Sequence, residues 1–373
     1  MTLIIRQHAT ACLLALTVAI LFSLSTQWCV NAQDVRSNVT QLIQYWGYPV
    51  EQHDVTTPDG YILSVQRIPH GRFNRHGGST PRKVVFLQHG FLDCSATWVN
   101  NLPYQSLGFI LADAGYVSGQ PKLAYVGHSQ GCKMALECFT SMAPNSRNLK
   151  YAACPRDFTD KISIFIALAP VSYLNHPGSE MVKILARLHV DEVLEGLGVN
   201  EFLPSTKQIQ KWEPRICSNS ILEKEICMNT YCLLNGCHGL KAKANETRLP
   251  LYMDRLPAGT STLNAGHWAQ LVRSGNFQMF DYGMIENYAR YHQLSPPQIE
   301  LRNLHVDIAV YHGGLDVLAD VRDVQRFLSE IPSSRVKNVM YLEDYGHIDF
   351  VWGIENYRSI YVDVLKRIAD SFK

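Results

Sequence analysis

Short apolar runs separated by polar stretches dominate the pattern of this chain of 373 residues. Runs rich in Val, Ile, Leu and aromatic side chains are typical of strands in the interior of a sheet. Five such runs are found, at 84–87, 123–126, 162–169, 304–311 and 339–342. Apolar residues at helical spacing follow three of them, at 134–139, 321–331 and 354–372. Strands that alternate with helices predict an α/β fold with a mostly parallel sheet flanked by helices.

This alternation is interrupted between residues 173 and 295, where helical periodicity and a cluster of cysteines replace the strands. We expect this stretch to be a largely helical cap inserted into the core. The predicted organisation is a signal peptide at 1–32, a core in two parts at 33–172 and 296–373, and the cap at 173–295. Ahead of the first core strand we expect a short helix from about residue 38 and a hairpin that turns at Pro58-Asp59-Gly60.

The first 32 residues have the features of a secretory signal peptide. Arg6 precedes an apolar run from about Ala11 to Leu24, and Val30-Asn31-Ala32 resembles a cleavage site. A membrane anchor is the alternative, although the run is short for a span. Asn38 and Asn245 begin glycosylation sequons, which agrees with secretion. We therefore expect a glycoprotein that is secreted, or delivered through the secretory pathway to a lysosome or vacuole.

The cysteines favour disulfides over a metal site. Ten are present, and eight remain once Cys12 and Cys29 leave with the signal peptide. Four of these crowd one part of the cap: Cys217, Cys227, Cys232 and Cys237. Zinc would explain such a cluster, but no C-x-x-C pair occurs in it, and a secreted context favours disulfides. The spacing leaves all three pairings of the four open, and no metal or cofactor is predicted.

The overall composition gives no reason to expect nucleic-acid binding. The net charge is +1, and no basic run is interleaved with aromatic residues. A hydrophobic content of 46% with 18% charged residues is typical of a folded globular protein. Gly313-Gly314 is too short for a phosphate-binding loop, and no obligate protein partner is evident from the sequence.

The strongest chemical signal is the segment Gly127-His128-Ser129-Gln130-Gly131, which fits G-x-S-x-G. It lies between a predicted strand and a predicted helix, which is the context that a nucleophile elbow requires. The turn is so tight that Ser129 must adopt a strained backbone and the residues two before and two after it must be small. We therefore predict Ser129 as the nucleophile of an α/β-hydrolase.

An oxyanion hole is expected from two backbone amides near this serine. The strand at 84–87 ends in a His89-Gly90 turn, where α/β-hydrolases place one of the two amides, here that of Phe91. The other belongs to Gln130, which follows the nucleophile. Two converging N–H groups stabilise an oxyanion by several kcal/mol. His89 could be a second base, but a structural role is favoured.

A base and an orienting carboxylate complete the predicted triad. In α/β-hydrolases the chain order is Ser, then Asp or Glu, then His. Asp316 follows the strand at 304–311 and His347 follows the strand at 339–342, so both lie at carboxyl ends of predicted parallel strands. The competing carboxylates are Asp344 and Asp349, which flank His347 too closely, and Asp320, which looks like a helix-start residue.

Several segments together resemble the acid lipases, the family of gastric and lysosomal lipases. The matching segments are 45–63, 87–90, 101–103, 106–116, 127–131, 280–283, 313–316 and 346–350. They cover nearly the whole mature chain. The resemblance implies an α/β-hydrolase fold with an inserted cap and the hydrolysis of lipid esters, with triacylglycerol or sterol ester bound at a lipid–water interface.

Two departures from the family pattern stand out. Tyr116 leads almost at once into the segment 117–122, so several dozen core residues that the family has before the strand at 123–126 are absent. The stretch 146–158 looks longer than the family's loop and includes Cys154. An alternatively spliced or mispredicted transcript would produce both features, and a genuine compact relative is the other explanation.

The sequence therefore predicts a serine carboxyl-ester hydrolase of neutral lipid esters. Peptidases, thioesterases and acyltransferases use the same triad and remain alternatives. A further alternative is a folding-impaired, catalytically silent variant. Net stabilities are only about 5–15 kcal/mol, so the loss of a core strand and its helix could exceed the whole stability.

Overall fold

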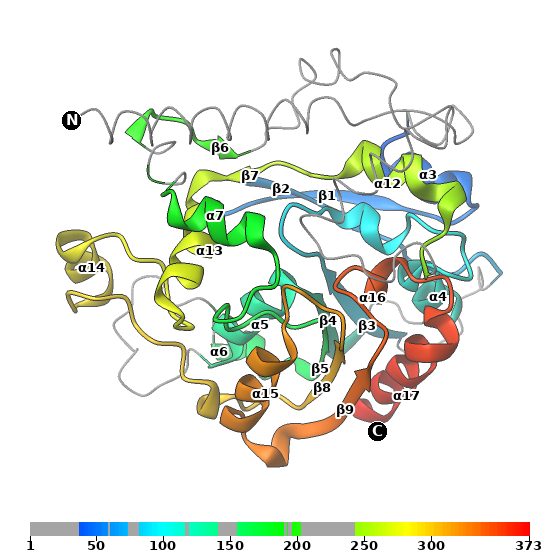
Figure 1. The fold of residues 1–373 in the computed structure, drawn as a ribbon. Coiled ribbons are helices and arrows are strands. Elements are labelled where there is room, and N and C mark those ends of the chain that lie inside the picture. Colours follow the sequence, from blue (N-terminus) through cyan, green and yellow to red (C-terminus); the bar gives the residue numbers. More distant parts are fainter. Residues whose placement is uncertain are drawn as a thin grey trace.

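The computed structural model describes residues 37–58, 60–73, 82–115, 119–140, 154, 156–189, 192, 196–202 and 243–373. A five-stranded sheet with the order β3-β4-β5-β8-β9 lies at its centre (Figure 1). The strands are β3 (Arg82–Gln88), β4 (Gly119–His128), β5 (Ile162–Leu168), β8 (Ile308–Gly313) and β9 (Val336–Leu342). Each neighbouring pair is parallel. The predicted α/β fold with a parallel sheet is confirmed.

Helices cover both faces of this sheet. On one side lie α5 (Gln130–Thr140) and α15 (Val321–Glu330), and on the other lie α4 (Leu107–Asp113) and α17 (Val362–Ser371) (Figure 1). The middle strands β5 and β8 are buried almost throughout, as is expected of parallel strands covered on both faces. On the α5 side, Phe139 packs edge-on against Phe165 of β5.

Strand β3 departs from the prediction, because 84–87 was expected to be buried on both faces. Val84, Val85 and Leu87 are only half-buried, and Phe86 is 39% exposed. The physical reason is the position of the strand: β3 forms the edge of the sheet and pairs only with β4 among the described residues. The nucleophile strand β4 is itself paired on both sides, by β3 and β5.

The elements before the core sheet agree with the sequence pattern. The predicted short helix is α3 (Val39–Tyr45), and the predicted hairpin is the antiparallel pair β1 (Glu51–Thr56) and β2 (Ile62–Arg67). Its turn contains Gly60 at a φ of 96°, which favours glycine. Shorter elements that connect the first core strands are η1 (Ser95–Trp98) and α6 (Arg156–Thr159).

The described part of the cap is mostly helical, as predicted. It contains α7 (Glu180–Arg187), β6 (Glu201–Phe202), η3 (Glu246–Arg248), α12 (Leu249–Arg255), β7 (Thr260–Ser261), α13 (Thr262–Ser274) and α14 (Met284–Tyr291). Helix α13 is well delimited, because the Ser261 side chain accepts from the Asn264 amide and Gly275 follows in the left-handed conformation. The four clustered cysteines lie outside the described residues, as does the predicted signal peptide, and the domain limits stay predictions.

The remaining elements complete the second half of the core. They are η4 (Leu301–Asn303), η5 (Ser333–Arg335), α16 (Asp349–Trp352) and a π-helical turn, η6 (Tyr357–Tyr361), that leads into α17. Within the described ranges, no helix is long and apolar enough to span a membrane.

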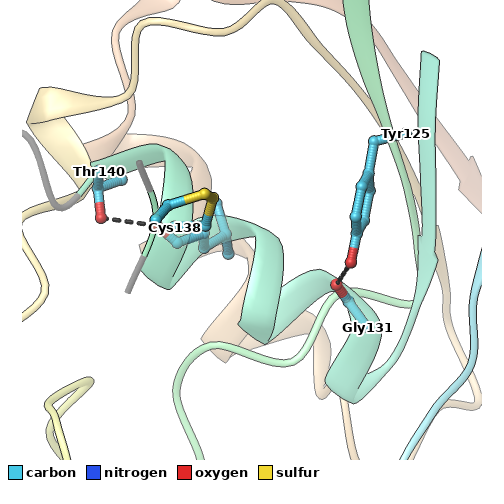
Figure 2. The surroundings of a disulfide bond; sticks show 6 residues. Tyr125, Gly131, Cys138 and Thr140 are labelled. Atoms are coloured by element: carbon cyan, nitrogen blue, oxygen red, sulfur yellow. Dashed lines mark hydrogen bonds between the residues drawn. A yellow bond between two sulfur atoms is a disulfide. The ribbon is translucent and has the colours of Figure 1, made fainter. Parts of the chain in front are cut away.

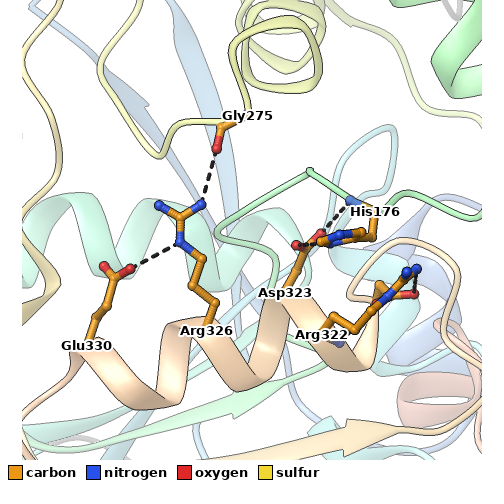
Figure 3. Close-up of polar contacts among 7 residues, drawn as sticks. His176, Gly275, Arg322, Asp323, Arg326 and Glu330 are labelled. Atoms are coloured by element: carbon orange, nitrogen blue, oxygen red, sulfur yellow. Dashed lines mark hydrogen bonds and ion pairs between the residues drawn. The ribbon is translucent and has the colours of Figure 1, made fainter.

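Helix α15 holds the cap at two places, near His176 and at Gly275 (Figure 3). Its buried Asp323 carboxylate accepts from the His176 backbone amide at 2.9 Å and lies 2.8 Å from His176 Nδ1. One turn later, Arg326 pairs with Glu330 and donates to the carbonyl of Gly275, which ends α13. The segment that enters the cap and the helix that crosses it are thus attached to one core helix.

Candidate active site

Ser129 lies at the sharp turn between β4 and α5, as the motif predicts. Its φ is 54°, a left-handed value that is strained for serine, and its amide donates to the carbonyl of Leu168 at 3.1 Å. A Cβ atom at Gly127 would lie 2.8 Å from the backbone of Gly131, and one at Gly131 would collide with the Gln88 carbonyl. Both glycines are therefore required by close packing around the turn.

The predicted oxyanion residues lie beside this serine. A Cβ atom at Gly90 would lie 3.1 Å from Ser129 Cβ and 3.5 Å from its Oγ, so the turn that carries Phe91 approaches the nucleophile closely. Gln130 is the first residue of α5, where a backbone N–H has no acceptor within the helix. Both residues therefore flank the nucleophile, and the assignment of their backbone amides as oxyanion donors stays a prediction.

The structure pairs the predicted base with the predicted carboxylate. Nδ1 of His347 lies 3.0 Å from Oδ1 and 2.9 Å from Oδ2 of Asp316, and both side chains are almost fully buried. Asp316 Oδ1 also accepts from the amides of Leu318 and Ala319, which fixes the carboxylate. Because Nδ1 faces the carboxylate, Nε2 is the ring nitrogen that would act as a general base.

Close packing between the loops after β8 and β9 explains how these two residues meet. The amide of Gly314 donates to the Leu342 carbonyl and that of Leu315 donates to the Tyr345 carbonyl. A Cβ atom at Gly313 would collide with the same Tyr345 carbonyl. The Gly313-Gly314 pair therefore serves the close approach of the two loops.

His128 is a site residue that the sequence analysis did not identify. Its ring centroid lies 4.9 Å from that of His347, and its Nε2 lies 2.9 Å from the backbone carbonyl of His347. Burial lowers the pKa of His128 to about 3, with the neighbouring His347 acting in the same direction, so the ring is neutral. Since a carbonyl can only accept, Nε2 of His128 carries the proton and supports the loop of the catalytic base.

The competing residues have other roles. Asp320 caps α15 by accepting from the Arg322 amide, which confirms its interpretation as a helix-start residue. Asp344 is exposed and pairs with Lys243 at 2.6 Å. Asp349 is buried and accepts from the Gly346 amide at 2.7 Å. His89 Nδ1 lies 2.9 Å from the carbonyl of the adjacent Gly90.

A disulfide joins the end of the nucleophile helix to the following segment (Figure 2). It links Cys138 of α5 to Cys154, a pairing that the sequence analysis missed because it treated Cys154 only as a departure from the family. Figure 2 also shows Tyr125 of β4 donating to the Gly131 carbonyl at 2.9 Å, a bond that attaches the helix start to the strand before it. Among the described residues, Cys94 and Cys132 are free thiols.

The two predicted glycosylation residues differ in their surroundings. Asn38 is exposed and caps α3 by accepting from the Gln41 amide. Asn245 is half-buried, and its Nδ2 donates to Gln105 Oε1 at 3.2 Å. Glycosylation of either residue stays a prediction. In the described ranges no group of three His, Cys, Asp or Glu side chains is placed to hold a metal ion.

Comparison with known proteins gives a consistent set of relatives. Residues 39–102 match the family described as "Partial alpha/beta-hydrolase lipase region". Lysosomal acid lipase/cholesteryl ester hydrolase of Rattus norvegicus is 35% identical over 403 positions, which cover 93% of this chain and 96% of the relative. Gastric triacylglycerol lipase of Bos taurus is 35% identical, with 90% of this chain and 92% of the relative covered. Lipase member K of Homo sapiens is 34% identical, with 89% and 90% covered.

The rat comparison also bears on the expected gap in the core. Its 403 aligned positions exceed the 373 residues of this chain, so the relative contains residues without a counterpart here. This agrees with the short connection between α4 and β4. The α/β-hydrolase prediction is confirmed by the matching family region together with the parallel sheet.

Proposed function

Because the chain belongs to the acid lipase family, we propose that it is a serine carboxyl-ester hydrolase whose substrates are neutral lipid esters. The observation that carries the chemical part is the His347–Asp316 pair, with two oxygens of one buried carboxylate 2.9 and 3.0 Å from Nδ1. This pair lies in loops that pack against the nucleophile turn through His128.

The proposed reaction follows the general course of serine hydrolysis. Ser129 Oγ attacks the ester carbonyl carbon while His347 Nε2 takes the hydroxyl proton, and Asp316 stabilises the imidazolium that forms. The oxyanion accepts from the amides of Phe91 and Gln130. His347 then gives its proton to the leaving alcohol, and water cleaves the acyl-enzyme by the same sequence of steps.

The substrate class rests on the relatives. The rat and bovine proteins are named as a cholesteryl ester hydrolase and a triacylglycerol lipase, which supports sterol esters and triacylglycerols as substrates here. An ester of long acyl chains needs an apolar pocket with few polar anchors. We place that pocket beneath the cap, next to Ser129, and expect the enzyme to act at a lipid–water interface.

One comparison tests the catalytic and lipase parts separately. A fluorophosphonate probe should label Ser129 in the intact protein, and Ser129→Ala should lose both labelling and hydrolysis. Activity on emulsified triacylglycerol is then compared with activity on short water-soluble esters, peptides and thioesters. Hydrolysis of soluble esters alone would reject the lipase assignment and keep the hydrolase. Labelling of another residue would reject the triad.

We also propose that the protein enters the secretory pathway. The Cys138–Cys154 disulfide supports this, because such bonds persist in oxidising compartments. The gastric and lysosomal names of the relatives are consistent with either a secreted or a lysosomal destination. N-terminal sequencing and a count of free thiols test the proposal. A protein that still begins at Met1 or Thr2 and has all its thiols free would contradict it.

An impaired variant is the second candidate, and one structural feature favours it. The edge strand β3 exposes 39% of Phe86, and the β1–β2 hairpin exposes 71% of Ile62 and 51% of Leu63. Exposed apolar side chains and an open strand edge each favour association over a soluble monomer. Expression of this chain beside a version with the missing core residues restored decides between the two. Equal soluble yield and equal turnover would exclude impairment.

A further inference from the structure

We propose that Trp268, on cap helix α13, is a positioning residue that holds both oxyanion-hole turns in place. This inference rests on the proposed hydrolase function. It assigns to the cap a part in catalysis that is separate from binding the acyl chain. The residues that the cap holds are Phe91 and Gln130, whose backbone amides are the two proposed oxyanion donors.

One indole ring contacts both turns. The Trp268 ring stacks on the ring of Phe91, with centroids 5.0 Å apart and planes 29° apart. Its Nε1–H donates to Oε1 of Gln130 at 2.8 Å. The indole is 7% exposed, so it is packed firmly between the cap and the core. Movement of this ring would therefore displace the two amide-bearing residues together.

The Gln130 side chain has a second cap partner one helical turn before Trp268. Gln130 Nε2 donates to Asn264 Oδ1 at 3.2 Å, and Asn264 Nδ2 lies 3.3 Å from Gln130 Oε1. Asn264 is itself fixed at the start of α13, because its amide donates to Ser261 and its Nδ2 to Thr260. The carboxamide of Gln130 thus has all its polar atoms bonded to the cap.

A buried polar cluster locks the same two helices further along. Lys133 of α5 is almost fully buried and lies 2.5 Å from Glu137 and 3.1 Å from Nδ1 of His267. His267 directly precedes Trp268, and its other nitrogen lies 2.8 Å from the Gln278 carbonyl. These contacts fix the position of α13 relative to α5, so the indole of Trp268 contacts Gln130 in a defined position.

The chemical consequence follows from how an oxyanion hole works. Its donors stabilise the transition state only when they are held at the oxyanion position before the reaction starts. A displacement of about 1 Å can lower the rate by about 10². Loosening the cap contact should therefore lower kcat and leave KM nearly unchanged, since the amides act on the transition state and not on the bound ester.

The test uses two substitutions at Trp268 and a matched control. Trp268→Phe keeps an aromatic ring against Phe91 but removes the N–H, and kcat should fall by about fivefold, the effect of one ordinary hydrogen bond. Trp268→Ala removes both contacts and should lower kcat by about 10². Trp46→Phe is the control, because Trp46 directly follows the end of α3 and its buried indole N–H has no hydrogen-bond partner among the described residues. Its kcat should stay at the wild-type value.

Amide hydrogen exchange on the intact protein gives a readout that does not depend on turnover. Trp268→Phe should speed exchange in peptides that cover 89–94 and 129–133, and Trp46→Phe should not. Unchanged exchange there, or an unchanged kcat in both Trp268 variants, would overturn the proposal. If the wild-type protein hydrolyses no ester through Ser129, the proposed function fails, while hydrogen exchange still decides whether Trp268 positions the two turns.

Discussion

Asp349 lies two residues after His347 and should make the stability of the fold depend on pH. Its Oδ2 accepts a hydrogen bond from the Gly346 amide at 2.7 Å, whereas Oδ1 is buried without a partner among the described residues. Burial raises the pKa of this carboxyl group from 3.8 to about 6, since the anion loses its hydration. The protonated form is therefore favoured in the folded state.

The coupling between proton binding and folding determines the sign and the size of this pH dependence. Between pH 3.8 and about 6 the folded protein binds more protons at this group than the unfolded chain does. Stability is therefore lost as the pH rises through this window and stays lowered above it. A shift of about 2 units corresponds to about 3 kcal/mol. Burial also raises the pKa of Asp93 to about 6, which acts in the same direction.

Asp349→Asn tests this expectation by urea denaturation between about pH 4 and about pH 8. Asparagine stays neutral and its Oδ1 can still accept from Gly346, so the variant should gain up to about 3 kcal/mol relative to the wild type as the pH rises. Asp344→Asn changes an exposed carboxylate of the same loop and should keep the wild-type pH dependence. If the free energy of unfolding changes with pH by the same amount in Asp349→Asn and in the wild type, the reasoning is refuted.

Three further predictions concern the site and the helix that carries the nucleophile. Asp316→Asn should lower kcat by about 10⁴ without unfolding the protein, because the wrong tautomer of His347 is stabilised; steady-state kinetics and a thermal melt check this. His128→Ala should cost about 1–3 kcal/mol by leaving the His347 carbonyl unpaired. It should lower kcat without moving the acid limb of the pH–rate profile, and a shifted limb would show that His128 titrates. Cys138→Ser opens a cross-link between residues 16 apart and should cost about 3 kcal/mol in a denaturation series. An unchanged midpoint would contradict that estimate.

The proposed catalytic residues could be predicted from the sequence because each is defined by its local surroundings. Ser129 is identified by glycines two residues away on either side, which the structure explains through the collision that a Cβ atom at Gly131 would cause with Gln88. Asp316 and His347 follow strand-forming runs in the expected chain order, and the structure joins them at 2.9 Å. Short-range constraints of this kind determine which residues occur at neighbouring positions, so they can be recognised in the sequence.

Contacts between distant segments were not accessible in the same way. The support that His128 gives to His347 spans 219 residues, and the bond from Trp268 to Gln130 spans 138. Neither contact produces a repeating pattern in the sequence, because each is formed by a single side chain on each element. The Cys138–Cys154 bond was missed for a related reason, since cysteine spacing does not specify which cysteines meet.

The order of the strands shows why a gap in the core need not disturb the chemistry. The sequence indicates that core residues are missing directly before the nucleophile strand, but β4 is paired with β3 on one side and β5 on the other. The edge of the sheet on this side is β3, where Phe86 is exposed. Ser129, Asp316 and His347 follow β4, β8 and β9, all of which are paired within the sheet. We therefore expect the gap to affect stability and solubility more than the arrangement of the three proposed catalytic residues.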